Sequence, residues 1–169
     1  MKHILLTTTL IFATVGFATA QQKKTPLSPP SEASATFGGK PVTIKYNSPS
    51  VKTRKIFGGL VPYGEVWRAG ANAATLLHTE TDLIIGTLSV PKGDYTLYVL
   101  PTATEWTLIV NKQTGQWGTE YSQSNDLGRA KMTVKAAPAL VESYKMSLTA
   151  AALQIEWENT IATIPVKAK

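Results

Sequence analysis

The sequence predicts an all-β protein, and within that class an antiparallel β-sandwich of jelly-roll-like or immunoglobulin-like type. In almost every apolar stretch the residues alternate at a period of two, which is typical of half-buried strands. Glycine, proline and other turn residues separate these stretches. No convincing helix start is followed by an apolar stripe at helical spacing. A closed β-barrel is the alternative architecture.

The expected strands begin with a hairpin. Gly38 and Gly39 separate two extended stretches, which is a signal for a tight two-residue turn. Further along the chain, Pro91 to Asp94 joins a strand that ends at Val90 to one that starts at Tyr95. Alternation predicts strands at residues 42–46, 95–99, 106–110, 132–134, 144–148, 153–157 and 161–166.

Two irregular regions interrupt the series of strands. They run from Ser48 to Asn72 and from Lys112 to Gly128. Loops of this length in a compact domain are often functional. We therefore expect any selectivity of the domain to lie in these segments and not in its strands.

The N-terminus has the pattern of a secretory signal. A basic start at Met1 to His3 precedes an apolar run from Ile4 to Phe17, and Ala18-Thr19-Ala20 forms a cleavage site of the A-x-A type. The apolar run is shorter than the roughly 20 residues that cross a bilayer. We expect a signal peptide at residues 1–20, cleavage between Ala20 and Gln21, and export to the periplasm, the cell surface or the medium of a bacterium.

Composition supports one domain and excludes several kinds of chemistry. Residues 21–33 are rich in proline and hydroxyl residues and indicate a flexible tether, which leaves residues 34–169 as a single domain. The absence of cysteine excludes disulfides, thiol nucleophiles and thiolate metal sites. The formal charge of +6 is modest, so we expect no nucleic-acid partner. The oligomeric state stays open.

The most informative polar cluster surrounds Arg68. Its planar guanidinium suits a carboxylate, phosphate or sulfate, and Asn72 adds an amide that can donate and accept. Between Lys40 and Arg68 there are six basic residues and one acid, Glu65. Arg54 and Trp67 join these residues as candidate ligand contacts. The alternative is structural: Arg68 could pair with Glu156 or Glu158 and hold the loop to the sheet, with Trp67 in the core.

Other candidates are more isolated. His78 lies on one face of an expected strand and is more typical of a structural or surface histidine, because a lone histidine cannot complete a zinc site. Trp117, on a polar loop with glycines, suits either stacking on a sugar or peptide or capping one end of the fold. The sequence holds no phosphate loop, dinucleotide fingerprint or EF-hand loop. We therefore expect no cofactor, no bound metal and no catalytic residues.

The stretch from Gly58 to Thr75, GGLVPYGEVWRAGANAAT, resembles the signature of a secreted family described as domain of unknown function 2911. That family usually carries threonine at the position of Ala69 and glutamate at that of Ala73. The resemblance implies a small exported β-rich domain and no established reaction. The resemblance extends over about residues 34–166, with further blocks at 48–52, 54–58, 90–98, 105–107, 111–118 and 153–158. In the block at 90–98, the family has a P-x-G-x-Y-x-L hairpin.

These observations favour a non-catalytic domain that binds a small polar, anionic or glycan ligand, as a binding or envelope-accessory module. Two alternatives stay open. The first is a hydrolase that uses His78 or the pair Glu156 and Glu158. The second is a protein-interaction scaffold.

Overall fold

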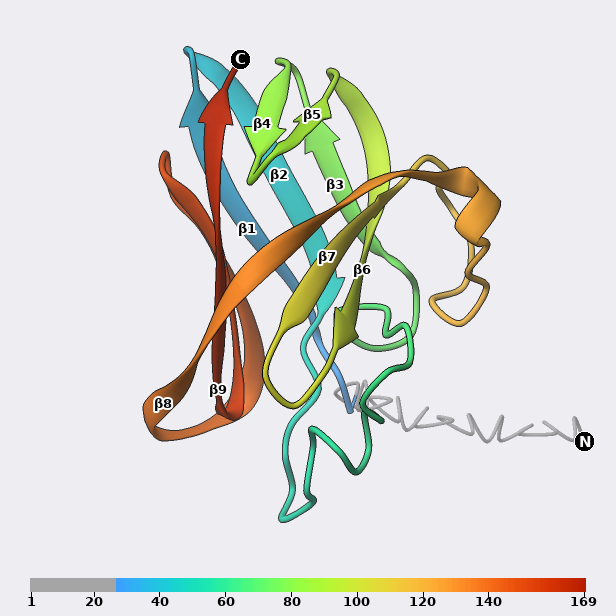
Figure 1. Cartoon of the computed structure of the whole chain (residues 1–169), viewed down its shortest axis with the longest axis vertical. Coiled ribbons are helices and arrows are strands. Elements are labelled where there is room, and N and C mark those ends of the chain that lie inside the picture. Colours follow the sequence, from blue (N-terminus) through green and yellow to red (C-terminus); the bar gives the residue numbers. More distant parts are fainter. Residues whose placement is uncertain (1–26) are drawn as a thin grey trace, which may run out of the picture.

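The computed structural model describes residues 27–169, which are all-β (Figure 1). The predicted signal peptide, its cleavage site at Ala20 and Gln21, and the tether as far as residue 26 lie outside the described residues. Within residues 27–169, no helix is long and apolar enough to cross a membrane. The strands are β1 (Pro30–Phe37), β2 (Lys40–Asn47), β3 (Thr75–Thr79), β4 (Leu83–Ile85), β5 (Leu88–Val90), β6 (Gly93–Pro101), β7 (Trp106–Asn111), β8 (Asp126–Leu148) and β9 (Ala152–Ala168), and a 3-10 turn, η1, covers Gln123–Asn125.

All nine strands form one antiparallel sheet, in the order β1-β2-β3-β6-β7-β8-β9-β4-β5. The long strand β8 connects its two parts, since it pairs with β7 as far as Met132 and with β9 from Thr133 onward. The sheet is not closed, because β1 and β5 are its two ends. The predicted all-β class is therefore confirmed. The alternative of a closed barrel is wrong for residues 27–169, because strand pairing defines one open sheet, and the sandwich stays a prediction.

The predicted hairpin between β1 and β2 is present. Gly38 and Gly39 have φ values of 57° and 78°, so both central residues of the turn adopt the left-handed conformation that favours glycine. β1 begins at Pro30, earlier than the sequence suggested, so residues 30–33 belong to the strand and not to the tether. The prolines obscured this start, but a proline at the first residue of an edge strand removes no ladder hydrogen bond.

The connection from Pro91 to Asp94 differs from the hairpin that the family pattern implied. β5 and β6 are not neighbours in the sheet: β5 pairs with β4, whereas β6 pairs with β3 and β7. The short connection therefore links the far end of the sheet to its middle. A turn signal marks a change of direction, and it cannot specify which strands pair across it.

Alternation places one face of the strands in the core. Trp106 and Trp157, which lie in two of the predicted strands, are 2% and 1% exposed and belong to the core. On β6 and β7 the opposite face is buried too, at residues such as Tyr98 and Asn111. The segment after β7 covers that face, because the Asn111 side chain donates a hydrogen bond to the carbonyl of Ser122 over 2.9 Å.

The two predicted irregular regions are present, with bounds of residues 48–74 and 112–125, and we call them the β2–β3 segment and the β7–β8 segment. Figure 1 shows the β2–β3 segment, in teal and green, extending beyond the ends of the strands. The two segments touch: Ala73 and Trp117 form a backbone bridge, and the amide of Gly118 donates to the carbonyl of Asn72 over 3.0 Å.

Candidate functional site

The β2–β3 segment forms most of a cleft of about 570 Å³, which we call the Arg68 cleft. Lys52 contributes a further cation to its lining, and Trp157 on β9 contributes an apolar wall. No aspartate or glutamate is among the residues that line it. The cleft brings together four of the residues singled out in the sequence, Arg54, Trp67, Arg68 and Asn72, whereas His78 and Trp117 are not part of its lining.

Arg68 is partly buried, and its side chain crosses Gly118 of the β7–β8 segment. A Cβ atom at Gly118 would overlap Arg68 Cδ, so only a glycine leaves room for this path. Arg68 Nε is buried and has no hydrogen-bond partner within residues 27–169, and the ion pairs in that range do not include Arg68. A partly buried cation without an acidic partner is electrostatically unfavourable, and an approaching anion would relieve that cost.

Trp67 contributes to both the core and the cleft. Its indole stacks on that of Trp157, with ring centroids 5.7 Å apart and an interplanar angle of 18°. Phe57 and Tyr144 pack edge-on against the Trp67 ring, and its Nε1 donates to the carbonyl of Gly70 over 3.2 Å. Trp67 is therefore a fixed wall of the cleft, held by the aromatic cluster behind it.

Arg54 and Asn72 occupy the rim of the cleft. The Nε of Arg54 donates to the carbonyl of Val51 over 3.0 Å, so this guanidinium folds back onto its own segment. Asn72 is exposed and has a φ of 60°, a conformation that asparagine tolerates better than most residues. Both residues are exposed, whereas Arg68 is partly buried.

Glu158, and not Arg68, ties the β2–β3 segment to the sheet. One carboxylate oxygen of Glu158 accepts a hydrogen bond from the amide of Ile56 over 3.1 Å, and the other accepts from the amide of Phe57 over 3.5 Å. Glu156 lies 3.7 Å from the ammonium of Lys145. Neither acid pairs with Arg68, so the structural pairing that the sequence left open is absent in residues 27–169. The donors to Glu158 are backbone amides, so the pattern of side chains in the sequence could not reveal this contact.

We expect Glu158→Ala to lower the free energy of unfolding by about 1–2 kcal/mol, because two partly buried amides lose a charged acceptor. The matched control is Glu156→Ala on the same strand, whose side chain is 18% exposed and pairs only with Lys145 at 3.7 Å, so it is expected to cost clearly less than Glu158→Ala. Urea denaturation of both variants measures the difference. Equal losses would show that the Glu158 carboxylate does not hold the segment.

His78 and Trp117 lie apart from the cleft lining. His78 Nδ1 is 2.7 Å from a carboxylate oxygen of Asp94 on the neighbouring strand, and the two side chains are 44% and 58% exposed. This is an open surface pair. Trp117 is 53% exposed, and its backbone joins Ala73 beside the cleft. Stacking of a ligand on Trp117 stays a prediction.

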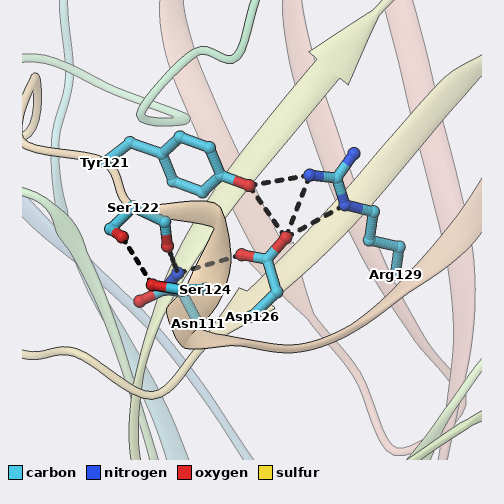
Figure 2. Close-up of polar contacts among 6 residues, drawn as sticks. All are labelled: Asn111, Tyr121, Ser122, Ser124, Asp126 and Arg129. Atoms are coloured by element: carbon cyan, nitrogen blue, oxygen red, sulfur yellow. Dashed lines mark hydrogen bonds and ion pairs between the residues drawn. The ribbon is translucent and has the colours of Figure 1, made fainter.

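A polar network at the base of the β7–β8 segment was not anticipated from the sequence (Figure 2). The Tyr121 hydroxyl donates to Asp126 over 2.8 Å, and Arg129 donates to both residues over 2.7–3.0 Å. Burial, followed by the hydrogen bond to Asp126 and its charge, raises the pKa of the Tyr121 phenol. The phenol therefore keeps its proton and remains a donor. These residues are close in sequence, but the chain between them is an irregular loop and a 3-10 turn, whose conformation no spacing rule predicts.

A second cavity of about 540 Å³, which we call the Gln116 groove, lies on the face of the sheet that the β7–β8 segment covers in part. Gly115 and Gln116 form one wall. Glu32, Lys45, Leu76 and Thr96 lie in one row across β1, β2, β3 and β6, and all four line the groove. The row follows from strand register, which the sequence could not provide.

In the part of the chain that the structure describes, no group of three or more histidine, aspartate or glutamate side chains is placed to hold a metal ion. Comparison with known proteins gives one match: a family model described as "Protein of unknown function (DUF2911)" matches residues 28–166. This confirms the resemblance seen in the sequence. No curated protein and no solved structure matches the chain.

Proposed function

The chain belongs to the DUF2911 family, which is described only as proteins of unknown function, and from its site we propose that it is an exported, non-catalytic binding module for a small anionic ligand. The ligand binds in the Arg68 cleft, on a scaffold that we take to be a β-sandwich. Export rests on the signal pattern of residues 1–20. Mass spectrometry of the exported protein should give a chain that begins at Gln21, and a retained Met1 would contradict export.

The guanidinium of Arg68 carries the proposal. It is partly buried, crosses Gly118, and has neither an ion-pair partner nor an acceptor for Nε within residues 27–169. Burying the Nε–H of Arg68 without an acceptor costs free energy, because a buried donor is left without a hydrogen bond. A carboxylate or sulfate that binds the guanidinium in bidentate fashion would offset this cost.

The remaining lining is consistent with an organic anion. Lys52 and Arg54 add positive charge at the rim, and the acid beside them, Glu142, accepts a hydrogen bond from the amide of Lys52. Trp67 and Trp157 offer apolar surface for a carbon skeleton. The volume of about 570 Å³ falls within the range of small-molecule sites, roughly 300–1,000 Å³. A sugar acid combines the required charge and carbon ring.

The alternatives draw less support from the geometry. His78 and Asp94 form a pair on an open face, and neither belongs to the lining of the Arg68 cleft. The Glu158 carboxylate is occupied by backbone amides. An interaction scaffold would use the exposed Leu60, Tyr63 and Trp117. That function would gain support only if small anions fail to bind.

Tryptophan fluorescence tests the proposal, since two tryptophans line the cleft. Glucuronate and its neutral counterpart glucose are titrated into the wild-type protein, Arg68→Met, and the control Lys135→Met, which removes an exposed cation elsewhere. We expect saturable binding of glucuronate alone. Arg68→Met should weaken it about 10- to 100-fold, the equivalent of a lost charged hydrogen bond, whereas Lys135→Met should leave it unchanged. Unaltered binding by Arg68→Met would contradict the proposal, as would failure of glucuronate, sulfate and phosphate to bind at all.

A further inference from the structure

The Gln116 groove contains a buried acceptor whose orientation is fixed by its neighbours. The Thr96 hydroxyl donates to the carbonyl of Gln113 over 2.7 Å, and the Tyr98 hydroxyl donates to that of Glu120 over 3.4 Å. Both hydroxyl oxygens are therefore free to accept from the Gln116 amide nitrogen, which lies 3.3 Å and 3.1 Å away. The same nitrogen lies 3.3 Å from the Gln113 carbonyl, which excludes the flipped amide.

This orientation leaves the amide oxygen of Gln116 without a donor. The residue is only 9% exposed, and its Oε1 has no hydrogen-bond partner within residues 27–169. An unsatisfied buried acceptor costs about 1–3 kcal/mol, so a ligand that brings a donor to this wall recovers binding energy. The oxygen is covered by the wall, so a ligand reaches it only where Gly115 and Gln116 move.

The charges of the groove differ from those of the Arg68 cleft. Its lining holds one acid and one base, Glu32 and Lys45, which face each other directly in the β1–β2 register. These charges balance, whereas the Arg68 cleft carries cations only. An uncharged unit with several hydroxyl groups therefore suits the groove, because its hydroxyl groups can donate to Glu32 and accept from Lys45, both of which are exposed.

The two cavities are immediate neighbours. In three separate stretches of chain, a residue that lines one cavity is followed within one or two residues by a residue that lines the other. Between two of these stretches, the backbone amide of Ser48 donates to the carbonyl of Pro29 over 2.9 Å. At these three places, adjacent stretches of backbone therefore line both cavities. The residues at these places, given with the cleft residue first, are Ser28 and Pro30, Pro49 and Asn47, and Asn72 and Ala73.

We infer that the two cavities bind one ligand, an acidic oligosaccharide, whose anionic unit lies in the Arg68 cleft and whose adjoining uncharged sugar lies in the Gln116 groove. The inference rests on the proposed function for the anionic unit. The groove itself is supported separately, by the fixed orientation of Gln116 and by the balanced charges of Glu32 and Lys45.

Calorimetric titration of the full chain tests the inference with three probes: glucuronate, a disaccharide of glucuronate linked to glucose, and neutral cellobiose. The groove is altered in two ways, by Gln116→Leu and by the double variant Glu32→Ala/Lys45→Ala, whose side chains are exposed and whose loss should leave the fold intact. Lys131→Ala, an exposed lysine on β8, is the matched control.

We expect the wild-type protein to bind the acidic disaccharide about tenfold more tightly than glucuronate, or about 1.4 kcal/mol. In both groove variants, the affinity for the disaccharide should fall to that for glucuronate. The affinity for glucuronate itself should not change. The wild-type protein could bind glucuronate and the acidic disaccharide equally tightly, with both affinities lost in Arg68→Met. That result would overturn the inference that one ligand occupies both cavities, and it would leave the proposed function intact. Cellobiose binding that survives Arg68→Met, with no binding of glucuronate, would instead overturn the anion site and the joint ligand with it.

Discussion

Replacing Trp157 with alanine is expected to lower the free energy of unfolding by about 3–5 kcal/mol, more than any other single substitution proposed for this protein. Trp157 is 1% exposed and contacts Trp67, Phe57 and Tyr144, with ring centroids 5.7–6.1 Å apart. Phe57 and Trp67 belong to the β2–β3 segment, so the cavity left by the indole would detach that segment from β9. Thermal or urea unfolding measures the loss.

Two further variants separate the explanations for this loss. Trp157→Phe keeps a ring in the cluster and removes an indole N–H that has no partner within residues 27–169, so it should cost clearly less than alanine. Trp117→Ala removes a tryptophan that is 53% exposed and should change stability by less than about 0.5 kcal/mol. If Trp157→Ala were no more harmful than Trp117→Ala, the aromatic cluster would not be the core of the domain.

Gly118→Ala is expected to cost about 1–3 kcal/mol of stability and to weaken glucuronate binding at least about tenfold. The added Cβ would overlap Arg68 Cδ and lie 2.7 Å from the backbone oxygen of Asn72. The side chain of Arg68 must then leave its path, and the contact between the two irregular segments must open. Denaturation and fluorescence titration of the same variant measure the two effects.

A double-mutant cycle identifies the source of the strain. In an Arg68→Ala background the overlap with Cδ is gone, so Gly118→Ala should cost at least about 0.5 kcal/mol less than it does in the wild-type protein. An unchanged cost would assign the strain to the Asn72 backbone alone. The claim that the path of the Arg68 side chain depends on Gly118 would then be wrong.

Much of the fold could be predicted from the sequence, because alternation depends on local geometry. Val42, Ile44 and Leu97 face the core as their period of two requires, and the paired glycines at 38 and 39 form the expected turn. Strand pairing was less accessible. The alternation around residues 135–143 of β8 is weak, because this stretch is largely exposed and its register with β9 shifts. The length of β8 and its role between the two parts of the sheet were therefore missed.

The candidate site could be predicted only in part. Residue chemistry identified Arg68 and its neighbours in the β2–β3 segment, since clustered cations stand out in a chain of modest charge. The contact between Arg68 and Gly118 could not be inferred from the sequence. Gly118 lies in a different segment, and it contributes only the space that the Arg68 side chain occupies. The same applies to Glu158, which acts on backbone amides, and to Gln116, whose importance depends on three hydrogen bonds that form only in the fold.

The most direct test of the anion site is a nuclear magnetic resonance titration of the ¹⁵N-labelled protein with glucuronate at constant ionic strength. We predict that the Nε–H of Arg68, the indole N–H of Trp67 and the amide of Gly118 shift together and saturate with one dissociation constant. The backbone amide signal of His78, which lies outside the cleft lining, should not shift. Shifts that are absent at Arg68, or that rise without saturation across the whole surface, would contradict the binding site at the Arg68 cleft.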